Sequence, residues 1–514
     1  MSDPLVSRPA NRDQASDRFF SAYDQLIHDT INYHHVPAVS VAVIDGDSTW
    51  LKAYGMAQVA DELVQAEKVN TETLFNAGSM TKVFISAAIS LLVDDDSFPE
   101  VQWSTPVSQL LRDDFVLSDS HATQVVTIED ILSHRSGLAD QDDAFMGVHA
   151  KKPDTLKSVT RKLRYLPLAV PPRTKFLYCN AMYAVATYLI ETLTNMPIRD
   201  FLRQRIWTPL GMKNTYFGLD DVIEHQLLNK VAKGYGWDND KSSCFEVDHP
   251  RQPEAAGAGE MITTTGDYAL FLRCMLQRTG PISAAGHEEL VKPRMITDQD
   301  PNPFWSHQLY SMGLEIENYH GEQVIGHTGS TTGFACQMVF LPRKNWGFVI
   351  MGNTHVDVMG KTKIRWTLID DLLEVPASKR FDWNAYAARL EKELEAATIE
   401  DLYPNLPDSR LPLTVPLTDY TGSYWHAGYE ELTVDLESGR LEVDASDRCW
   451  RFKLLLEHIS GQYFVAKKVD IDTREEDLLK AEFRIDSSGS VGQLGIAFVA
   501  DSKDEIIWFD KIDS

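Results

Sequence analysis

Hydrophobic and polar positions predict β-structure at two places that lie far apart in the chain. From residue 38 the chain reads Ala-Val-Ser-Val-Ala-Val-Ile, then Asp45-Gly46-Asp47, then Ser-Thr-Trp-Leu-Lys-Ala-Tyr, which is typical of two strands joined by a tight turn. Runs of β type return at residues 323–325, 335–341 and 347–351, and helical and loop patterns dominate between residues 128 and 290. We therefore predict an α/β fold with one sheet built from both ends of this region and with helices inserted between them.

The segment after Leu74 has a helical pattern and is almost entirely apolar. Between Val83 and Val93 only Ser86 and Ser90 interrupt the hydrophobic residues, so the predicted helix has almost no polar face. This apolar stretch is far shorter than the roughly 20 residues that are needed to cross a bilayer. We therefore expect this helix in the centre of a folded domain, and we expect no membrane-spanning segment.

The composition changes beyond residue 373. A charged helix is predicted around residues 385–397, prolines follow between residues 404 and 416, and hydrophobic and polar residues then alternate on both sides of a turn at 437–440. This pattern predicts an all-β unit, a small barrel, behind a linker. The predicted division is an N-terminal tail at 1–19, a large α/β domain at 20–375, a helical and Pro-rich linker at 376–411 and a β-barrel domain at 412–514.

Composition and charge narrow the classes of function. Of the 514 residues, 43% are hydrophobic and 24% are charged, which is ordinary for a protein with a large interior. The formal net charge of −26 has the wrong sign for binding nucleic acid or anionic lipid headgroups, so we expect neither partner. The five cysteines are widely spread without a C-x-x-C pair, so we expect no disulfide framework, no metal site and no cofactor. The first residues contain no apolar run, and a cytoplasmic location is the default expectation.

Ser79 and Lys82 form the first candidate constellation, in the sequence Ser-Met-Thr-Lys. They fall where the apolar helix should begin, and residues three apart share one helix face, so the lysine amine can lie beside the serine hydroxyl. A buried amine loses its charge more easily than an exposed one, which would let Lys82 accept the serine proton. The alternative is an N-cap serine followed by a lysine that reaches solvent.

The second constellation is Tyr178-Cys179-Asn180, directly before another apolar helical pattern. Residues two apart in an extended segment face the same way, so Tyr178 and Asn180 can project into a cleft while Cys179 points away. A phenol near a lysine can relay protons, and an amide can orient a substrate carbonyl. The alternative is a buried tyrosine followed by an asparagine that caps the next helix.

The third constellation is the glycine-rich stretch at 326–333, which reads Gly-His-Thr-Gly-Ser-Thr-Thr-Gly between two β-type runs. Small residues on an edge strand let a substrate approach the backbone closely, and the backbone N–H groups then become available to an oxyanion. The alternative is a glycine-rich connection without a role.

These three constellations together resemble the serine β-lactamase and penicillin-binding-protein superfamily, which carries S-x-x-K, then Y-x-N, then a triplet ending in Thr-Gly. The match is closest to the class C branch, and supporting stretches occur in the same order at residues 37–44, 131–138, 209–212 and 256–267. The resemblance covers about residues 20–373 and implies a β-lactamase-like antiparallel sheet flanked by helices, with a helical insertion. The C-terminal unit is similar to the lipocalin-like barrels appended to some esterases and D-aminopeptidases of this superfamily.

The resemblance implies roles for the first two constellations. Ser79 would be the nucleophile that forms an acyl-enzyme. Lys82 and Tyr178 would share the general-base and general-acid work, and either of them could take the serine proton. Asn180 would help to hold Lys82 and the substrate amide or ester.

The third constellation implies an oxyanion hole and one departure from the superfamily. The backbone N–H groups of Ser79 and Ser330 would bind the oxyanion, and Gly329 would let the substrate approach. His327 stands where true β-lactamases usually have lysine, and a neutral imidazole cannot hold a substrate carboxylate by charge. We therefore expect a poor β-lactamase that prefers neutral esters or amides and gains affinity for carboxylates as the pH falls and His327 becomes protonated.

The leading interpretation is a serine hydrolase that cleaves an ester or amide bond of a small molecule through an acyl-serine intermediate. An acyltransferase that uses the same acyl-enzyme is one alternative, and a D-amino-acid amidase or aminopeptidase is another. A non-catalytic protein that binds acyl groups or peptides is a further alternative, although complete constellations of this kind are usually catalytic. The sequence does not indicate the oligomeric state.

Overall fold

The computed structural model describes residues 10–60, 65–297, 306–355, 358–383, 385–386, 398–499 and 505–512. The chain divides into two compact units, and each unit combines segments that are distant in sequence. The first unit consists of Met1–Val101, Ile190–Pro250 and Ala256–Trp383, and the second of Gln102–Leu189, Arg251–Ala255 and Asn384–Ser514.

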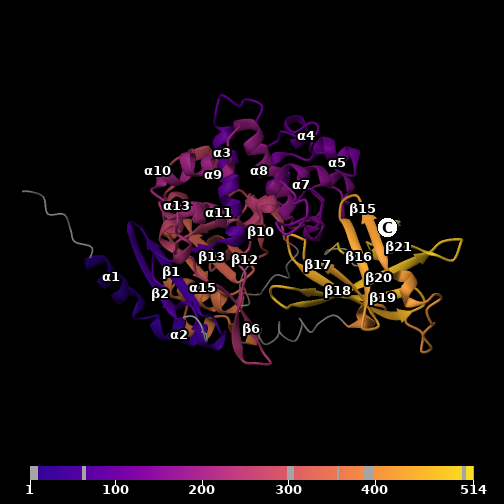
Figure 1. Cartoon of the computed structure of the whole chain (residues 1–514). Coiled ribbons are helices and arrows are strands. Elements are labelled where there is room, and N and C mark those ends of the chain that lie inside the picture. Colours follow the sequence, from indigo (N-terminus) through magenta and orange to yellow (C-terminus); the bar gives the residue numbers. More distant parts are fainter. Residues whose placement is uncertain are drawn as a thin grey trace, which may run out of the picture. The chain divides into compact units, whose positions relative to one another are not determined.

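A nine-stranded antiparallel sheet forms the centre of the first unit (Figure 1). Its strands, in spatial order, are β3 (Glu67–Lys68), β2 (Ser48–Gln58), β1 (Ala38–Asp45), β14 (Trp346–Gly352), β13 (Phe334–Leu341), β12 (Glu322–Thr331), β11 (Glu315–Tyr319), β10 (Leu309–Tyr310) and β9 (Met295–Ile296). Strands β1 and β2 are the predicted hairpin, and β14 lies beside β1 with Val41 opposite Ile350. The predicted sheet from both ends of this region is therefore confirmed.

Helices cover both faces of this sheet, which explains why its central strands read as continuous hydrophobic runs. Val39, Val41 and Val43 of β1 belong to one hydrophobic cluster with Ile27 and Ile364, which come from helices on one face. On the opposite face the Ser40 hydroxyl lies 2.7 Å from the Thr265 hydroxyl of another helix. The helices of this unit are α1 (Ala10–Phe20), α2 (Asp24–Tyr33), α3 (Lys82–Val93), α9 (Ile198–Leu202), α10 (Thr208–Leu210), α11 (Gly218–Glu224), α12 (Ala256–Gly259), α13 (Thr265–Gln277), α14 (Ala284–Leu290) and α15 (Val358–Leu372).

Two features of the first unit position the segment that contains Ser79 and Lys82. Helix α3 is buried from Lys82 to Leu92, as its lack of a polar face predicts. A small three-stranded sheet, in the order β4 (Phe75–Asn76), β8 (Met261–Thr263) and β5 (Thr215–Phe217), holds the chain that enters this helix. A further two-stranded sheet is formed by β6 (Gly234–Asp238) and β7 (Ser243–Val247).

The second unit contains short helices and a closed eight-stranded β-barrel. The helices are α4 (Val107–Leu110), α5 (Ser120–Val125), α6 (Ile128–Leu132), α7 (Leu156–Lys162), α17 (Ile399–Leu402) and most of α8 (Asn180–Thr194). The barrel strands are β15 (Gly422–His426), β16 (Glu430–Glu437), β17 (Arg440–Ala445), β18 (Phe452–Ser460), β19 (Tyr463–Asp470), β20 (Glu476–Ile485), β21 (Val491–Ile496) and β22 (Ile507–Ile512). The predicted C-terminal barrel is confirmed.

The predicted barrel hairpin is present, and its alternation holds at two of the three predicted apolar positions of β16, because Leu436 is exposed. Leu432 and Val434 of β16 are buried, the residues between and after them are exposed, and β16 turns into β17 at Ser438-Gly439, where both residues have positive φ. The helix predicted around residues 385–397 lies almost entirely outside the described residues. Within the described part of the chain, none of the helices combines the length and the apolar character that crossing a bilayer requires.

Candidate active site

Ser79 lies in a tight 3-10 turn, Gly78–Thr81, that connects β4 to α3. The Asn76 side chain accepts a hydrogen bond from the Gly78 N–H (2.7 Å), and the Thr81 hydroxyl donates to the Gly78 carbonyl (2.7 Å). The same Thr81 hydroxyl accepts from the Met261 N–H of β8 (3.1 Å). These bonds hold the turn at both ends, so the position of Ser79 depends on the backbone around it.

Lys82 is the first residue of α3 and is completely buried. Its Nζ donates to the Ser79 Oγ over 2.9 Å and to the backbone carbonyl of Ala258 over 2.9 Å. The amine therefore lies within proton-transfer distance of the serine hydroxyl. This geometry differs from the alternative predicted from the sequence, in which the lysine reaches solvent.

Strand β12 approaches the Ser79 turn so closely that glycine is required on both sides. A Cβ on Gly78, whose φ is +49°, would lie 2.9 Å from the Ser330 backbone nitrogen, and a Cβ on Gly329 would lie 2.1 Å from the Ala77 carbonyl oxygen. Among the described strands, β12 pairs with β11 as far as Gly326 and with β13 as far as Thr331. Among these strands, the end of β12 that faces the turn is therefore paired on one side only.

His327 is buried on β12 and is neutral. The Tyr310 hydroxyl lies 2.9 Å from Nε2, and Nδ1 is in contact with the Thr328 carbonyl, which can only accept a hydrogen bond. Nδ1 therefore carries the proton and Nε2 accepts from the tyrosine. Burial and the nearby charge of Lys82 lower the pKa of His327 to about 3. The expectation that His327 becomes protonated under mildly acidic conditions is therefore wrong, because the ring is desolvated and lies near a cation.

Tyr178 and Asn180 belong to the second unit, and the structure confirms how their side chains alternate. Both are partly exposed, whereas Cys179 between them is buried and its thiol pKa is raised by burial. The Cys179 N–H donates to Nδ1 of His134 (3.0 Å), and the His134 ring lies 4.2 Å from the ring of Tyr178. His134 therefore supports the segment that carries Tyr178. The raised pKa makes Cys179 a poor nucleophile.

Asn180 begins helix α8, and its side chain amide is held by an aspartate. Its Nδ2 donates to Oδ2 of Asp142 over 2.7 Å. Asp142 starts a short 3-10 turn, Asp142–Ala144, in the segment between α6 and α7. This bond turns the nitrogen end of the Asn180 amide toward Asp142.

The structure shows three partners that the sequence pattern did not reveal. They are the Ala258 carbonyl beside Lys82, the Tyr310 hydroxyl beside His327 and the Asp142 carboxylate beside Asn180. For the Ala258 carbonyl, the run of small residues at 255–259 indicates a place where the backbone can approach another group closely. The other two are single residues far from their partners in sequence, and no local pattern indicates them.

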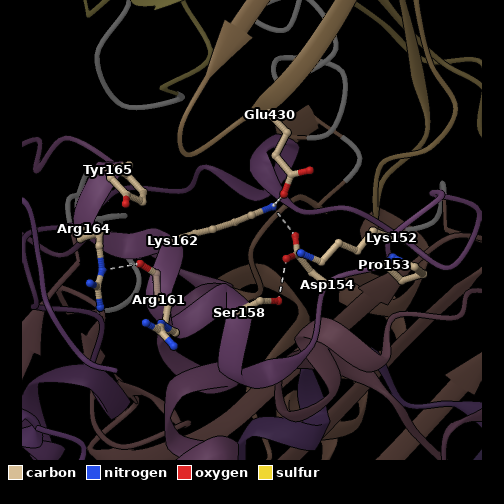
Figure 2. Close-up of a pocket in the computed structure, with 9 residues that line it drawn as sticks. All are labelled: Lys152, Pro153, Asp154, Ser158, Arg161, Lys162, Arg164, Tyr165 and Glu430. Carbon is tan, nitrogen blue, oxygen red and sulfur yellow. Dashed lines mark hydrogen bonds and ion pairs between the residues drawn. The ribbon is translucent and has the colours of Figure 1, made fainter. Parts of the chain in front are cut away.

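The second unit also contains a polar cavity of about 280 Å³ (Figure 2). At its centre the Lys162 amine of α7 binds Asp154 (2.5 Å) and Glu430 of the barrel strand β16 (2.7 Å). The cavity is lined by Lys152, Pro153, Asp154, Ser158, Arg161, Lys162, Arg164, Tyr165 and Glu430, so the predicted catalytic residues are not part of its wall.

Known protein families match both the region of the large sheet and the region of the barrel. The Beta-lactamase family profile matches residues 22–371, and the profile of a domain of unknown function, DUF3471, matches residues 407–511. The protein named unguisins hydrolase ungD' from Aspergillus campestris is 36% identical over 99% of this chain and 94% of its own length. A D-aminopeptidase from Brucella anthropi is 23% identical over 70% of this chain and 64% of its own length.

Solved structures show the same fold. The octameric penicillin-binding protein homologue from Pyrococcus abyssi is 20% identical, covers 95% of this chain and 99% of its own, and gives a TM-score of 0.56. The D-amino acid amidase from Ochrobactrum anthropi SV3 is 25% identical, covers 68% of this chain and 100% of its own, and gives a TM-score of 0.52.

Proposed function

Because the chain belongs to the beta-lactamase family and is a serine hydrolase of amide or ester bonds, we propose that it works through an acyl-Ser79 intermediate. The observation that carries this proposal is the completely buried Lys82 amine, 2.9 Å from the Ser79 hydroxyl. The same amine also donates to the Ala258 carbonyl, so it is held beside the serine by a contact with the backbone. A general-base role explains why this amine is buried beside the serine.

The proposed reaction follows from this geometry. Lys82 or Tyr178 takes the proton of Ser79, whose oxygen attacks the substrate carbonyl carbon. The oxyanion that forms is bound by the N–H groups of Ser79 and Ser330, and the close approach of β12 to the Ser79 turn supports this role. The leaving amine or alcohol receives a proton from the same pair of residues, and water then attacks the acyl-serine ester to release the acid.

We propose a neutral amide as the substrate class. His327 has a pKa of about 3, so it supplies no positive charge for a substrate carboxylate at ordinary pH. The relatives named as a D-aminopeptidase and a D-amino acid amidase favour amide substrates and an acyl group of D configuration. We therefore expect D-amino acid amides to be cleaved faster than their L counterparts, and cephalosporins to be poor substrates.

A serine-reactive fluorophosphonate tests the nucleophile. Labelling followed by peptide mapping should identify one modified peptide, which contains Ser79, and Ser79→Ala should abolish both labelling and turnover. Labelling of a different serine, or turnover that survives Ser79→Ala, would refute the proposal. A protein that binds amides without cleaving them or being labelled would be the non-catalytic alternative.

A substrate panel tests the substrate class. The panel contains p-nitrophenyl esters, D- and L-amino acid anilides, a chromogenic cephalosporin and an unguisin, the last because of the relative at 36% identity. Addition of alcohols or amines as acceptors separates hydrolysis from acyl transfer, because a transferase diverts the acyl group to the acceptor. Efficient cleavage of the cephalosporin alone would contradict the proposed preference for neutral amides. The predicted cytoplasmic location stays a prediction, which cell fractionation tests.

A further inference from the structure

The segment at residues 142–147, in which Asp142 holds the Asn180 amide, is bound to the barrel by backbone pairing. The Cys449 N–H donates to the Phe145 carbonyl (2.8 Å), and the Gly147 N–H donates to the Asp447 carbonyl (2.8 Å). Met146 and Arg448 form an antiparallel bridge between these two bonds. Residues 145–147 therefore add a short strand to the loop between β17 and β18, which fixes one end of the segment.

Buried side chains reinforce this pairing. Arg448 is only 2% exposed, its guanidinium donates to the Glu431 carbonyl, and it contacts the Met146 sulfur. A Cβ on Gly147 would lie 2.6 Å from the Arg448 carbonyl oxygen, so the two backbones are in direct contact. The Met146 N–H also donates to Asp154, which binds the Lys162 amine, and Lys162 in turn binds the barrel residue Glu430 (Figure 2). The segment cannot shift without breaking these contacts.

A charged pair fixes the other end of the segment. The Lys468 amine of β19 binds both carboxylate oxygens of Asp143, at 2.7 and 2.6 Å. The side chains are 23% and 14% exposed, so solvent screens the pair only partly. Asp140 and Asp142 precede Asp143 and form an acidic group of three with it, and the charge of Lys468 acts on Asp143 and Asp140. Burial raises the pKa of Asp140, hydrogen bonds from Asp142 lower it, and the charge of Asp143 raises it by a smaller amount.

Asp142, the middle residue of this acidic group, holds the Asn180 amide. Its Oδ2 accepts from Asn180 Nδ2 over 2.7 Å, and its own N–H donates to Asp140 Oδ1 over 3.0 Å. Because Asp142 directly precedes Asp143, the ion pair between Asp143 and Lys468 restrains the backbone that carries the Asp142 carboxylate. The barrel lysine and the Asn180 amide are therefore linked through two adjacent residues.

We propose that Lys468 of the barrel is a positioning residue for Asn180, acting through the Asp143 ion pair and the Asp142 hydrogen bond. Through this link the barrel contributes to the reaction by orienting an amide of the proposed catalytic constellation. This inference rests on the proposed function, since the orientation of Asn180 affects turnover only if the Ser79 constellation is the active site.

The test compares the rates at which the fluorophosphonate phosphonylates Ser79 in five full-length variants. Lys468→Met should lower the rate roughly tenfold, because a small displacement of a group in an active site is costly. Lys468→Arg should restore it to within about twofold, because it keeps the charge. Lys467→Met is the matched control: it removes the neighbouring lysine of the same strand, which pairs with Glu476, and should leave the rate unchanged. In an Asn180→Ala background, Lys468→Met should cause no further loss.

The last comparison separates positioning from a general effect on folding. A loss of the same size with and without Asn180, or a native rate for a folded Lys468→Met protein, would refute the role of Lys468. If Lys468→Met fails to fold, Lys468→Gln, which keeps an N–H donor without the charge, carries the same expectations. Labelling of Ser79 at a rate independent of Lys468 would refute this inference alone, whereas labelling of another serine would refute the proposed function.

Discussion

Each unit holds its own residues of the proposed catalytic constellation, and the two units do so by different physical means. Around Ser79 the constraints are steric and hydrogen-bonded: two glycines permit the contact between the turn and β12, and His327 is neutral. Around Asn180 ion pairs are added to backbone pairing: Lys468 pairs with Asp143, and Lys162 pairs with Asp154 and Glu430. Geometry that is set by backbone contact responds mainly to changes of side-chain volume, whereas geometry that is set by ion pairs also responds to charge and salt.

The sharpest test asks whether the two units contribute to one reaction. Lys82→Ala and Tyr178→Phe should each lower kcat/KM by about 10³-fold, since general acid-base catalysis contributes on that order. Residues that act as a unit are not additive, so the double variant should be about as active as either single variant. Tyr165→Phe, which alters a half-exposed tyrosine, is the control and should change kcat/KM less than about twofold. Losses that multiply in the double variant would show that the two residues act independently.

The second prediction tests the steric constraint around Ser79. Gly329→Ala should lower the rate of Ser79 acylation by about 10²-fold, because the new Cβ would lie 2.1 Å from the Ala77 carbonyl and must displace β12. Gly266→Ala in α13 is the matched control, since its Cβ would meet its nearest atom at 3.6 Å. That variant should keep the native rate. Native acylation by Gly329→Ala would show that the close contact is unnecessary.

The sequence predicts those features that depend on local patterns. The hairpin at β1 and β2, the buried helix α3 and the barrel hairpin at β16 and β17 follow from hydrophobic periodicity and turn residues. The S-x-x-K spacing predicts the contact between Lys82 and Ser79, because it depends on one helical turn. The link between Lys468 and Asp143 joins residues 325 positions apart, and a periodic pattern of hydrophobic residues cannot predict a contact over that separation. Likewise, the pKa of His327 depends on its burial in the folded chain.

The third prediction concerns the stability of the His327 region as a function of pH. The pKa of His327 is about 3 in the folded chain and about 6.5 in the unfolded chain, so the unfolded state binds the proton first as the pH falls. Its burial therefore costs stability below about pH 6.5, by about 1.4 kcal/mol for each pH unit down to the folded pKa. From pH 7 to pH 5, urea unfolding of the native chain should lose about 2 kcal/mol more than that of His327→Gln. Equal losses would show that His327 is protonated in the fold.

The smallest expected effect compares an ion pair from each unit. Glu430→Gln removes one of two carboxylates from the Lys162 amine, and both Lys162 and its other partner Asp154 are buried (Figure 2). Lys162 keeps Asp154, so the loss in the free energy of unfolding should be modest, about 1 kcal/mol. Glu246→Gln in the first unit removes the partner of Lys233, where both side chains are about half exposed, and should cost less than about 0.5 kcal/mol. Urea unfolding of both variants at low and high salt measures the difference. Equal costs would mean that burial does not strengthen the Lys162 pair, and that ionic contacts contribute no more to the second unit than to the first.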